Sequence, residues 1–201
     1  MLPRISPKRL RVLKEPFDNP DYVFELKHDG FRAVVYIQDG ECKIVSRNQK
    51  SMGFATLKKA LATLPVQDAI FDGEIVCLDA KGVSQFNQLL NRKVEPVLYA
   101  FDLLWLNGED LQRLPLIERK RRLAKLIQSA TCKRILYAQH IEQFGKRFFE
   151  EICSRDLEGI VGKRKLSIYK NDSTGGWIKV KNRAYSQAEG RHELLTRARR
   201  P

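Results

Sequence analysis

The residues best suited to chemistry begin with the string Glu25-Leu26-Lys27-His28-Asp29-Gly30-Phe31-Arg32. A lysine at the end of an expected strand, followed by a turn-forming Asp-Gly pair, projects its amine beside backbone that a ligand can approach closely. The Lys-x-Asp-Gly-x-Arg pattern is specific enough to count as a motif, although alone it is also compatible with a hairpin that carries solvated charges. The string marks Lys27 as the candidate reactive amine.

Three further strings carry charged side chains on segments that otherwise have strand character. Phe71-Asp72-Gly73-Glu74 places two acids in an apolar run, and Glu158 precedes the apolar segment Ile160–Lys163. In Trp177–Lys181 two lysines share one strand face, and Ile178 and Val180 take the other. Taken singly, each glutamate is best interpreted as a solvated or ion-paired strand carboxylate. Their occurrence together with Lys27 weakens that interpretation.

The charge balance indicates what kind of partner such a site would take. The chain has 201 residues, and 37 Lys and Arg against 24 Asp and Glu give a net charge of +13. This favours a polyanion, meaning nucleic acid, nucleotide phosphates or an anionic membrane, over a merely basic soluble protein, which charge alone leaves open. The excess is concentrated in residues 1–14 and 118–134.

Composition narrows the class of protein further. With 43% apolar and 30% charged residues, the chain is neither a disordered polyelectrolyte nor a membrane protein. No secretory signal is visible and no apolar stretch approaches a bilayer span, so we expect a cytoplasmic protein. The four cysteines form no Cys-x-x-Cys pair and the three histidines have no ligand spacing with them, which disfavours zinc and indicates reduced, packed thiols.

The elements that must position these residues follow from hydrophobic periodicity and turn signals. Strands are predicted at Tyr22–Lys27, Phe31–Ile37, Cys42–Ser46, Ile70–Leu78, Pro96–Leu106, Ile160–Lys163 and Trp177–Val180. Helices are predicted over 54–64, Leu116–Gln128 and Gln143–Cys153. We expect one well-buried face for Phe31–Ile37 and an Arg/Lys-rich outer face for Leu116–Gln128. The absence of a regular βαβ rhythm predicts an α+β fold with mixed, largely antiparallel sheets flanked by helices, and not a Rossmann fold.

Together, and in this order, the strings resemble the motifs of the covalent nucleotidyltransferase superfamily, which comprises ATP-dependent DNA ligases, RNA ligases and mRNA capping enzymes. The likeness is strongest to bacterial ATP-dependent DNA ligases, including the ligase domain of multifunctional end-joining ligases. It covers roughly residues 15–183 and rests on Phe24–Arg32, Ser46–Asn48, Phe71–Glu74, Tyr99–Leu104, Glu158–Lys163 and Trp177–Lys181. Gln49 departs from the glycine that usually follows Ser-Arg-Asn in these ligases.

The resemblance implies a covalent mechanism with ATP and Mg²⁺. Lys27 would attack the α-phosphorus of ATP, expel pyrophosphate and carry AMP as a lysyl phosphoramidate. Lys179 and Lys181 would act with it as catalytic and nucleotide-binding residues, because their charges neutralise the phosphate. Glu158 would hold the metal ion through a carboxylate oxygen.

The same resemblance implies the remaining contacts. Arg32 and Glu74 would address the ribose, Glu25 would lie near the adenine amino group, and Phe101 would stack on the base. Phe101 also has a structural interpretation, because Tyr99, Phe101, Leu103 and Trp105 could form one core face.

Outside this group, Arg47 in Ser46-Arg47-Asn48 would bind DNA. We place Lys163 second, since on a regular strand it faces away from Glu158. His28 is expected to be a turn or DNA-proximal residue and not a general base.

The expected organisation is an adenylation domain over residues 1–183 and a basic C-terminal tail over 184–201, with no OB-fold domain. The resemblance implies nicked double-stranded DNA as partner, a monomer that is nucleoid-associated if bacterial, and a second protein or domain as a source of OB-fold function.

Alternatives stay open at this point. An RNA ligase or a GTP-dependent guanylyltransferase would use the same motifs, and a minimal module could hold nucleotide or DNA ends without efficient sealing. The presence of all five of Lys27, Glu74, Glu158, Lys179 and Lys181 favours an enzyme.

Overall fold

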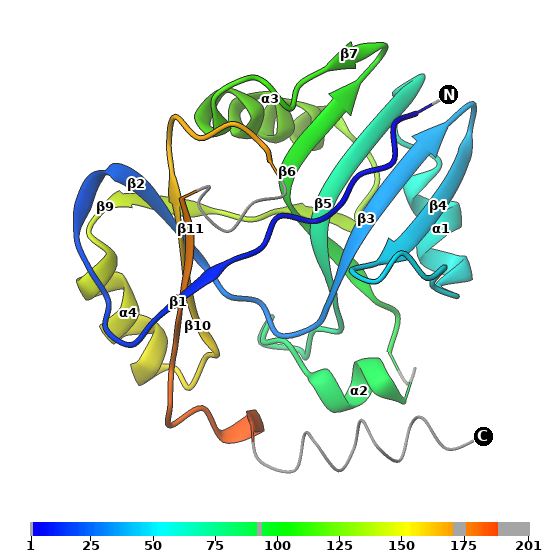
Figure 1. Cartoon of the computed structure of the whole chain (residues 1–201). Helices are drawn as coiled ribbons and strands as arrows, with labels where there is room; N and C mark the ends of the chain where they lie inside the picture. Colours follow the sequence, from blue (N-terminus) through cyan, green and yellow to red (C-terminus); the bar gives the residue numbers. More distant parts are fainter. Residues whose placement is uncertain (1, 92–93, 171–175, 189–201) are drawn as a thin grey trace.

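Two β-sheets face each other across the middle of the molecule (Figure 1). The computed structural model describes residues 2–91, 94–170 and 176–188. Among these, the larger sheet has the order β4-β3-β5-β6-β7, and β8 pairs with β6 outside this path. Its strands are β3 (Phe31–Gln38), β4 (Glu41–Ser46), β5 (Asp68–Val76), β6 (Val97–Leu106), β7 (Glu109–Asp110) and β8 (Ile135–Tyr137).

The smaller sheet has the order β1-β11-β10-β2-β9. Its strands are β1 (Arg11–Leu13), β2 (Asn19–Leu26), β9 (His140–Gln143), β10 (Gly159–Arg164) and β11 (Trp177–Lys181). All pairings in the two sheets are antiparallel except β1 with β11 and β6 with β8. Chain segments far apart in sequence therefore meet, because β10 and β11 lie beside β2.

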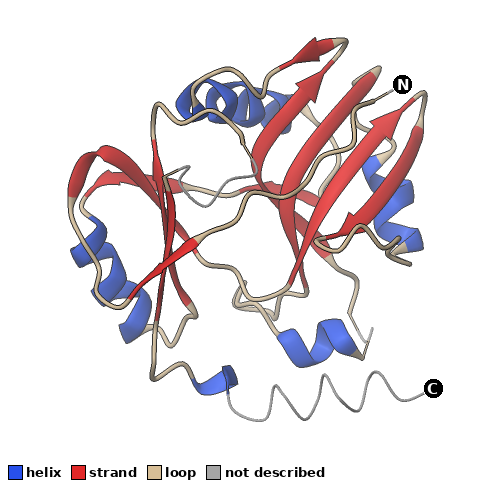
Figure 2. Ribbon diagram, in the orientation of Figure 1, coloured by secondary structure: helices blue, strands red, loops and turns tan. Residues whose placement is uncertain are grey.

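Helices cover the outer faces of both sheets (Figure 2). The larger sheet carries α1 (Ala55–Leu61) against β4 and α3 (Leu116–Ser129) against β6. The smaller sheet carries α4 (Gly145–Ser154) against β10 and β2. The short helix α2 (Phe86–Leu90) follows β5, and the 3₁₀ turn η1 (Ser186–Ala188) follows β11. This mixed α+β architecture confirms the predicted fold class.

The strand β3 has the well-buried face that the sequence predicted, and its other face is partly buried as well. Ala33, Val35 and Ile37 pack into the core under α1 and α3, as predicted. Val34 is also fully buried, in a second core that includes Ile5 of the N-terminal segment and Trp177 of β11. The opposite sheet and the N-terminal segment partly cover this second face.

The basic outer face predicted for α3 was wrong at two positions. Arg119 and Lys120 are among the most buried side chains in the described residues. Arg119 donates two hydrogen bonds to Asp102, at 2.7 and 2.8 Å, and Lys120 donates to Glu25 at 2.6 Å. Buried carboxylates beneath the helix satisfy both cations, which therefore add nothing to a polyanion-binding surface.

Two predicted segments lie partly outside the described residues. The loop before β11 includes 171–175, and most of the expected basic tail is 189–201. Residues 184–188 are described, and Tyr185 is buried against the domain. Within the described ranges, no helix is long and apolar enough to cross a membrane.

Candidate active site

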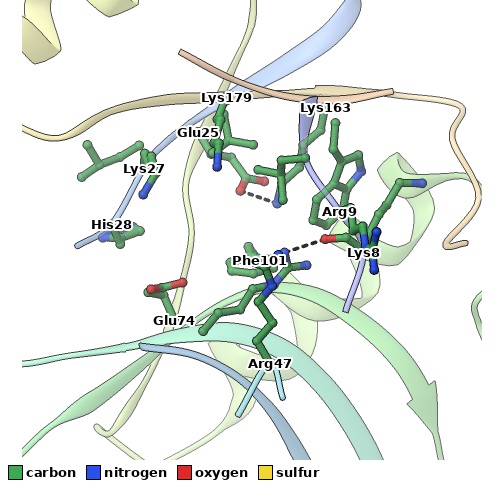
Figure 3. Close-up of a pocket in the computed structure, with 15 residues that line it drawn as sticks. Lys8, Arg9, Glu25, Lys27, His28, Arg47, Glu74, Phe101, Lys163 and Lys179 are labelled. Carbon is green, nitrogen blue, oxygen red and sulfur yellow. Dashed lines mark hydrogen bonds and ion pairs between the residues drawn. The ribbon is translucent and has the colours of Figure 1, made fainter. Parts of the chain in front are cut away.

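A cavity of about 360 Å³ opens between the two sheets and collects most of the residues that the sequence singled out (Figure 3). Both sheets and the N-terminal segment line it, and its sequence-predicted members are Glu25, Lys27, Arg32, Arg47, Glu74, Phe101, Lys163 and Lys179. Glu158 is in contact with Lys27 but lines a smaller cavity behind it, and Lys181 is exposed at the end of β11. We call the larger cavity the cleft.

Lys27 and Glu158 are brought together where β2 ends and β10 begins. The backbone N–H of Lys27 donates to the carbonyl of Gly159 at 2.9 Å, and Lys27 Nζ lies 2.7 Å from Glu158 Oε1. Gly159 has φ +140°, and a Cβ there would lie 2.2 Å from the Val180 carbonyl oxygen. Only glycine fits this close approach, which fixes Glu158 beside the lysine.

The loop after Lys27 is held tightly. Gly30 approaches β5 so closely that a Cβ would lie 2.1 Å from the Ile75 carbonyl oxygen. His28 stacks on Tyr99, with ring centroids 3.8 Å apart. Burial lowers the pKa of His28 to about 4, so the imidazole is neutral at pH 7. A neutral, stacked ring agrees with a turn residue.

Two lysines from β11 supply positive charge next to Lys27. Lys179 and Lys181 alternate with the buried Ile178 and Val180, as the sequence predicted. Burial lowers the pKa of Lys179, and the charges of Lys27, Lys181 and Arg47 lower it further. Several cations therefore converge on one region of the cleft, which suits a phosphate group.

Arg32 and Glu74 are directly opposite each other on β3 and β5. Arg32 donates to both carboxylate oxygens of Asp72, at 3.1 and 2.7 Å, and to the Lys8 carbonyl oxygen at 2.7 Å. Its orientation is fixed by these bonds. Burial raises the pKa of Glu74 to about 8, against the opposing charges of Lys27 and Arg32.

At the deep end of the cleft, Glu25 is held between two lysines. Lys120 Nζ and Lys163 Nζ each donate to it at 2.6 Å. Burial alone would raise the pKa of Glu25, but the two ammonium groups outweigh burial and hold that pKa below its usual value. Burial lowers the pKa of Lys163 to about 8, although Glu25 favours its charged form.

The secondary rank given to Lys163 rested on strand alternation, and the structure places this residue in the cleft. Lys163 Nζ lies 4.2 Å from the ring centroid of Phe101 and 4.1 Å from that of Trp177. Glu158 precedes the strand, and the positive φ of Gly159 breaks the alternation between the two residues. Strand alternation therefore does not relate the orientation of Lys163 to that of Glu158, and Lys163 faces the cleft.

Phe101 reaches the cleft through a β-bulge. In the pairing of β5 with β6, Gly73 is opposite Ala100 and Asp72 is opposite Asp102, so Phe101 has no register partner. The bulge re-aims the following residues, and Leu103 packs in the core with Ala100. The alternative in which Tyr99, Phe101, Leu103 and Trp105 form one core face is therefore wrong. The Phe101 ring lines the cleft, and its centroid lies 5.9 Å from that of the Trp177 ring.

Arg47 lies at the edge of the cleft in the turn after β4, and its side chain is exposed. Gln49 in the same turn has φ +61°, the left-handed region that glycine adopts without strain. Its side chain accepts a hydrogen bond from Arg4 at 3.1 Å and donates one to the Ile5 carbonyl at 2.9 Å. The unusual glutamine thus ties the N-terminal segment to this turn.

Three residues of the site were not predicted from the sequence. Lys8 and Trp177 line the cleft, and Lys120 holds Glu25. Lys120 had a visible signal, since it lies four residues after Leu116 and three before Leu123 on the buried stripe of α3. Lys8 carried no such signal. Its burial depends on a distant contact, the bond from its Nζ to the Ile168 carbonyl at 3.0 Å.

The fold and the cleft together define an adenylation domain of the nucleotide-transferring ligases. A family model for the ATP dependent DNA ligase domain matches residues 6–181. The chain belongs to this family.

Relatives and solved structures that are similar to this chain are also DNA ligases or DNA ligase-like proteins. The chain is 33% identical over 184 residues to the multifunctional non-homologous end joining protein LigD of Pseudomonas aeruginosa, covering 88% of this chain and 22% of that protein. It is 28% identical to the SPbeta prophage-derived DNA ligase-like protein LigB of Bacillus subtilis, covering 91% and 69%. A mycobacterial DNA ligase D complexed with ATP and MES superposes with a TM-score of 0.72 at 26% identity, covering 86% and 60%. The chain therefore spans about a fifth of the length of the Pseudomonas relative.

Proposed function

We propose that this chain activates DNA ends for joining by forming a covalent lysyl–AMP at Lys27. The observation that carries the proposal is the position of Lys27 Nζ, 2.7 Å from Glu158 and in one cleft with Lys179. The neutral amine would form a bond to the α-phosphorus of ATP and release one of its protons to solvent. The bond from phosphorus to the bridging oxygen would break, and pyrophosphate would leave with its electron pair. A covalent intermediate divides one difficult transfer into two easier ones.

Different residues of the cleft would bind the base, the ribose and the phosphates of ATP. Phe101 would stack on the base, and Glu25 with its two lysines would face the base edge at the deep end. Glu74 would form a hydrogen bond with a ribose hydroxyl, and Arg32, already fixed by Asp72, would border the ribose. Lys179 and Lys181 would neutralise the phosphates close to Lys27. The convergence of positive charge there, which lowers the pKa of Lys179, supports this orientation.

Glu158 is the residue that would hold Mg²⁺. A carboxylate oxygen is a hard ligand, and Mg²⁺ commonly takes one or two protein carboxylates and completes its shell with phosphates and water. Across the described ranges, no group of three or more His, Cys, Asp or Glu side chains forms a metal site, which fits a metal shared with a nucleotide. When bound, Mg²⁺ would neutralise negative charge on the phosphates.

Nicked duplex DNA is the proposed acceptor of AMP. The net charge of +13 and the exposed Arg47 at the edge of the cleft support binding to a phosphate backbone. AMP would pass from Lys27 to the 5′-phosphate of the nick, and the 3′-hydroxyl would then displace AMP to join the strands.

Incubation with ATP labelled at the α-phosphate, followed by a denaturing gel and by a nick-sealing assay, tests the proposal. Wild type and the surface control Lys125→Ala should become labelled, whereas Lys27→Ala should not. On a pre-adenylylated nick, Lys27→Ala should retain sealing, because the charging step is bypassed. A wild-type protein that binds ATP without becoming labelled would contradict the proposal.

A further inference from the structure

A residue that lies outside the ligase motifs contacts the loop that carries Lys27. Residues 182–188, here called the C-terminal clasp, continue from the end of β11 and lead into η1 at the bottom of the view in Figure 1. The hydroxyl of Tyr185 donates to Asp29 Oδ2 at 2.9 Å. Both residues are buried, with 4% of each residue's surface exposed. The bond thus joins the clasp to the residue two positions after Lys27.

The clasp also holds the segment that presents Glu158. The Asn182 side chain donates to the Leu157 carbonyl at 3.0 Å, and its backbone N–H donates to the Glu158 carbonyl at 3.0 Å. The backbone N–H of Ser186 donates to Asp156 at 2.9 Å. One short segment therefore contacts both loops whose ends meet in the Lys27–Glu158 ion pair.

A cavity lies beside the part of the loop that Tyr185 contacts. A cavity of about 210 Å³ lies behind Lys27, lined in part by Asp29, Glu158 and Tyr185. The start of the loop is held by the hydrogen bond from the Lys27 N–H to the Gly159 carbonyl. Its end is held by the close approach of Gly30 to Ile75. Asp29 lies between these points and lines the cavity, and its hydrogen bond with Tyr185 resists displacement of the loop into that cavity.

We propose that Tyr185 is a positioning residue for the nucleophile, holding Asp29 so that Lys27 keeps its place beside Glu158. This inference rests on the proposed role of Lys27. Misplacement of a reacting group by about 1 Å can lower a rate by about a hundredfold, so loss of one hydroxyl can matter without loss of the fold.

Tyr185→Phe removes the hydroxyl and keeps the ring. The matched control is Tyr22→Phe, since the Tyr22 ring packs against Phe17 and Phe24 and the substitution keeps that ring. With ATP and Mg²⁺, Tyr185→Phe should reduce the maximal rate of self-adenylylation by about tenfold to a hundredfold. Affinity for ATP, measured in a Lys27→Ala background, should change less than about twofold. Tyr22→Phe should leave both quantities unchanged.

Amide hydrogen exchange on the ligand-free protein provides a readout that does not require activity. In Tyr185→Phe the Lys27 amide, which is bonded to Gly159, should exchange faster, while amides in β3 and β5 keep their protection. Unchanged exchange at Lys27 would overturn the proposal, whether or not the protein is labelled by ATP. Equal losses of rate, ATP affinity and protection throughout the fold would also overturn it, since they indicate a purely structural residue. If wild type does not become labelled but the Lys27 amide exchanges faster in Tyr185→Phe, the result would count against the proposed function. It would still support the positioning role of Tyr185.

Discussion

Lys120 on α3 donates a 2.6 Å hydrogen bond to Glu25 on β2, across 95 positions of sequence. This bond links the helix layer to the strand that ends at the candidate nucleophile. Lys163 approaches the same carboxylate from β10 at 2.6 Å. Three segments of the chain therefore converge on one buried charge at the deep end of the cleft.

Removing one cation from this cluster should be costly. Lys120→Ala leaves Glu25 buried with a single partner, and breaking a buried pair typically costs about 3–5 kcal/mol. Denaturant unfolding should show a loss of this size, and ATP affinity should fall. Arg121→Ala, which removes a neighbouring exposed ion pair with Glu118, should leave the free energy of unfolding nearly unchanged. Similar small effects of both substitutions would show that the buried cluster does not stabilise the fold.

Glu74 should make the protein less stable at alkaline pH. Burial raises its pKa to about 8 in the folded protein from 4.5. A raised pKa means that the folded state favours the protonated carboxyl. The stabilising contribution of Glu74 to the free energy of unfolding is therefore fully present below pH 4.5 and is lost as pH rises through 8. Glu74→Gln does not titrate. Its melting temperature should exceed that of wild type by several degrees at pH 8.5, with a smaller difference at pH 5. A difference independent of pH would contradict the prediction.

His28 should have the opposite pH dependence. Burial lowers its pKa to about 4 from 6.5, so the folded state favours the neutral ring. The contribution of His28 to the free energy of unfolding is present above pH 6.5 and is lost as pH falls through 4. His28→Phe keeps a ring that can stack on Tyr99 and cannot be protonated. Between pH 7 and pH 4, thermal unfolding should show a larger loss of stability in wild type than in His28→Phe, and parallel losses would refute the assignment.

Arg47 should contribute a phosphate contact to DNA binding. Its exposed guanidinium lies at the edge of the cleft, so Arg47→Ala should weaken binding to nicked duplex at every sequence tested. The slope of log affinity against log salt should become shallower by about 1. Arg47→Lys should preserve most of the slope because it retains the charge. An unchanged slope in Arg47→Ala would remove this residue from the DNA interface.

Much of the fold followed from local pattern. The period-two strands, the two longer helices and the α+β class were all predictable, because half-buried strands and amphipathic helices carry periodic signals. The bulge at Phe101 was not, since a bulge depends on pairing with β5 and leaves no mark in a run of apolar residues. The left-handed Gly159 likewise disguised the place of Lys163 relative to Glu158.

The candidate site was predictable where motifs marked it. Lys27, Glu74 and Lys179 meet in the cleft as expected, whereas the charges that support them come from elements with no motif. Basic residues of α3 were assigned to a solvent face because a charged side chain is normally exposed. Only the tertiary structure shows that Asp102 and Glu25 lie beneath them.

The central claim is that Lys27 carries AMP, and intact-protein mass spectrometry with peptide mapping tests it most directly. After incubation with ATP and Mg²⁺, the account predicts a gain of one AMP per chain, through an acid-labile bond, on the peptide that contains Lys27. Lys27→Ala should gain nothing, and the surface control Lys125→Ala should gain the full mass. AMP mapped to another lysine, or an unmodified wild-type protein that demonstrably binds ATP, would contradict the account.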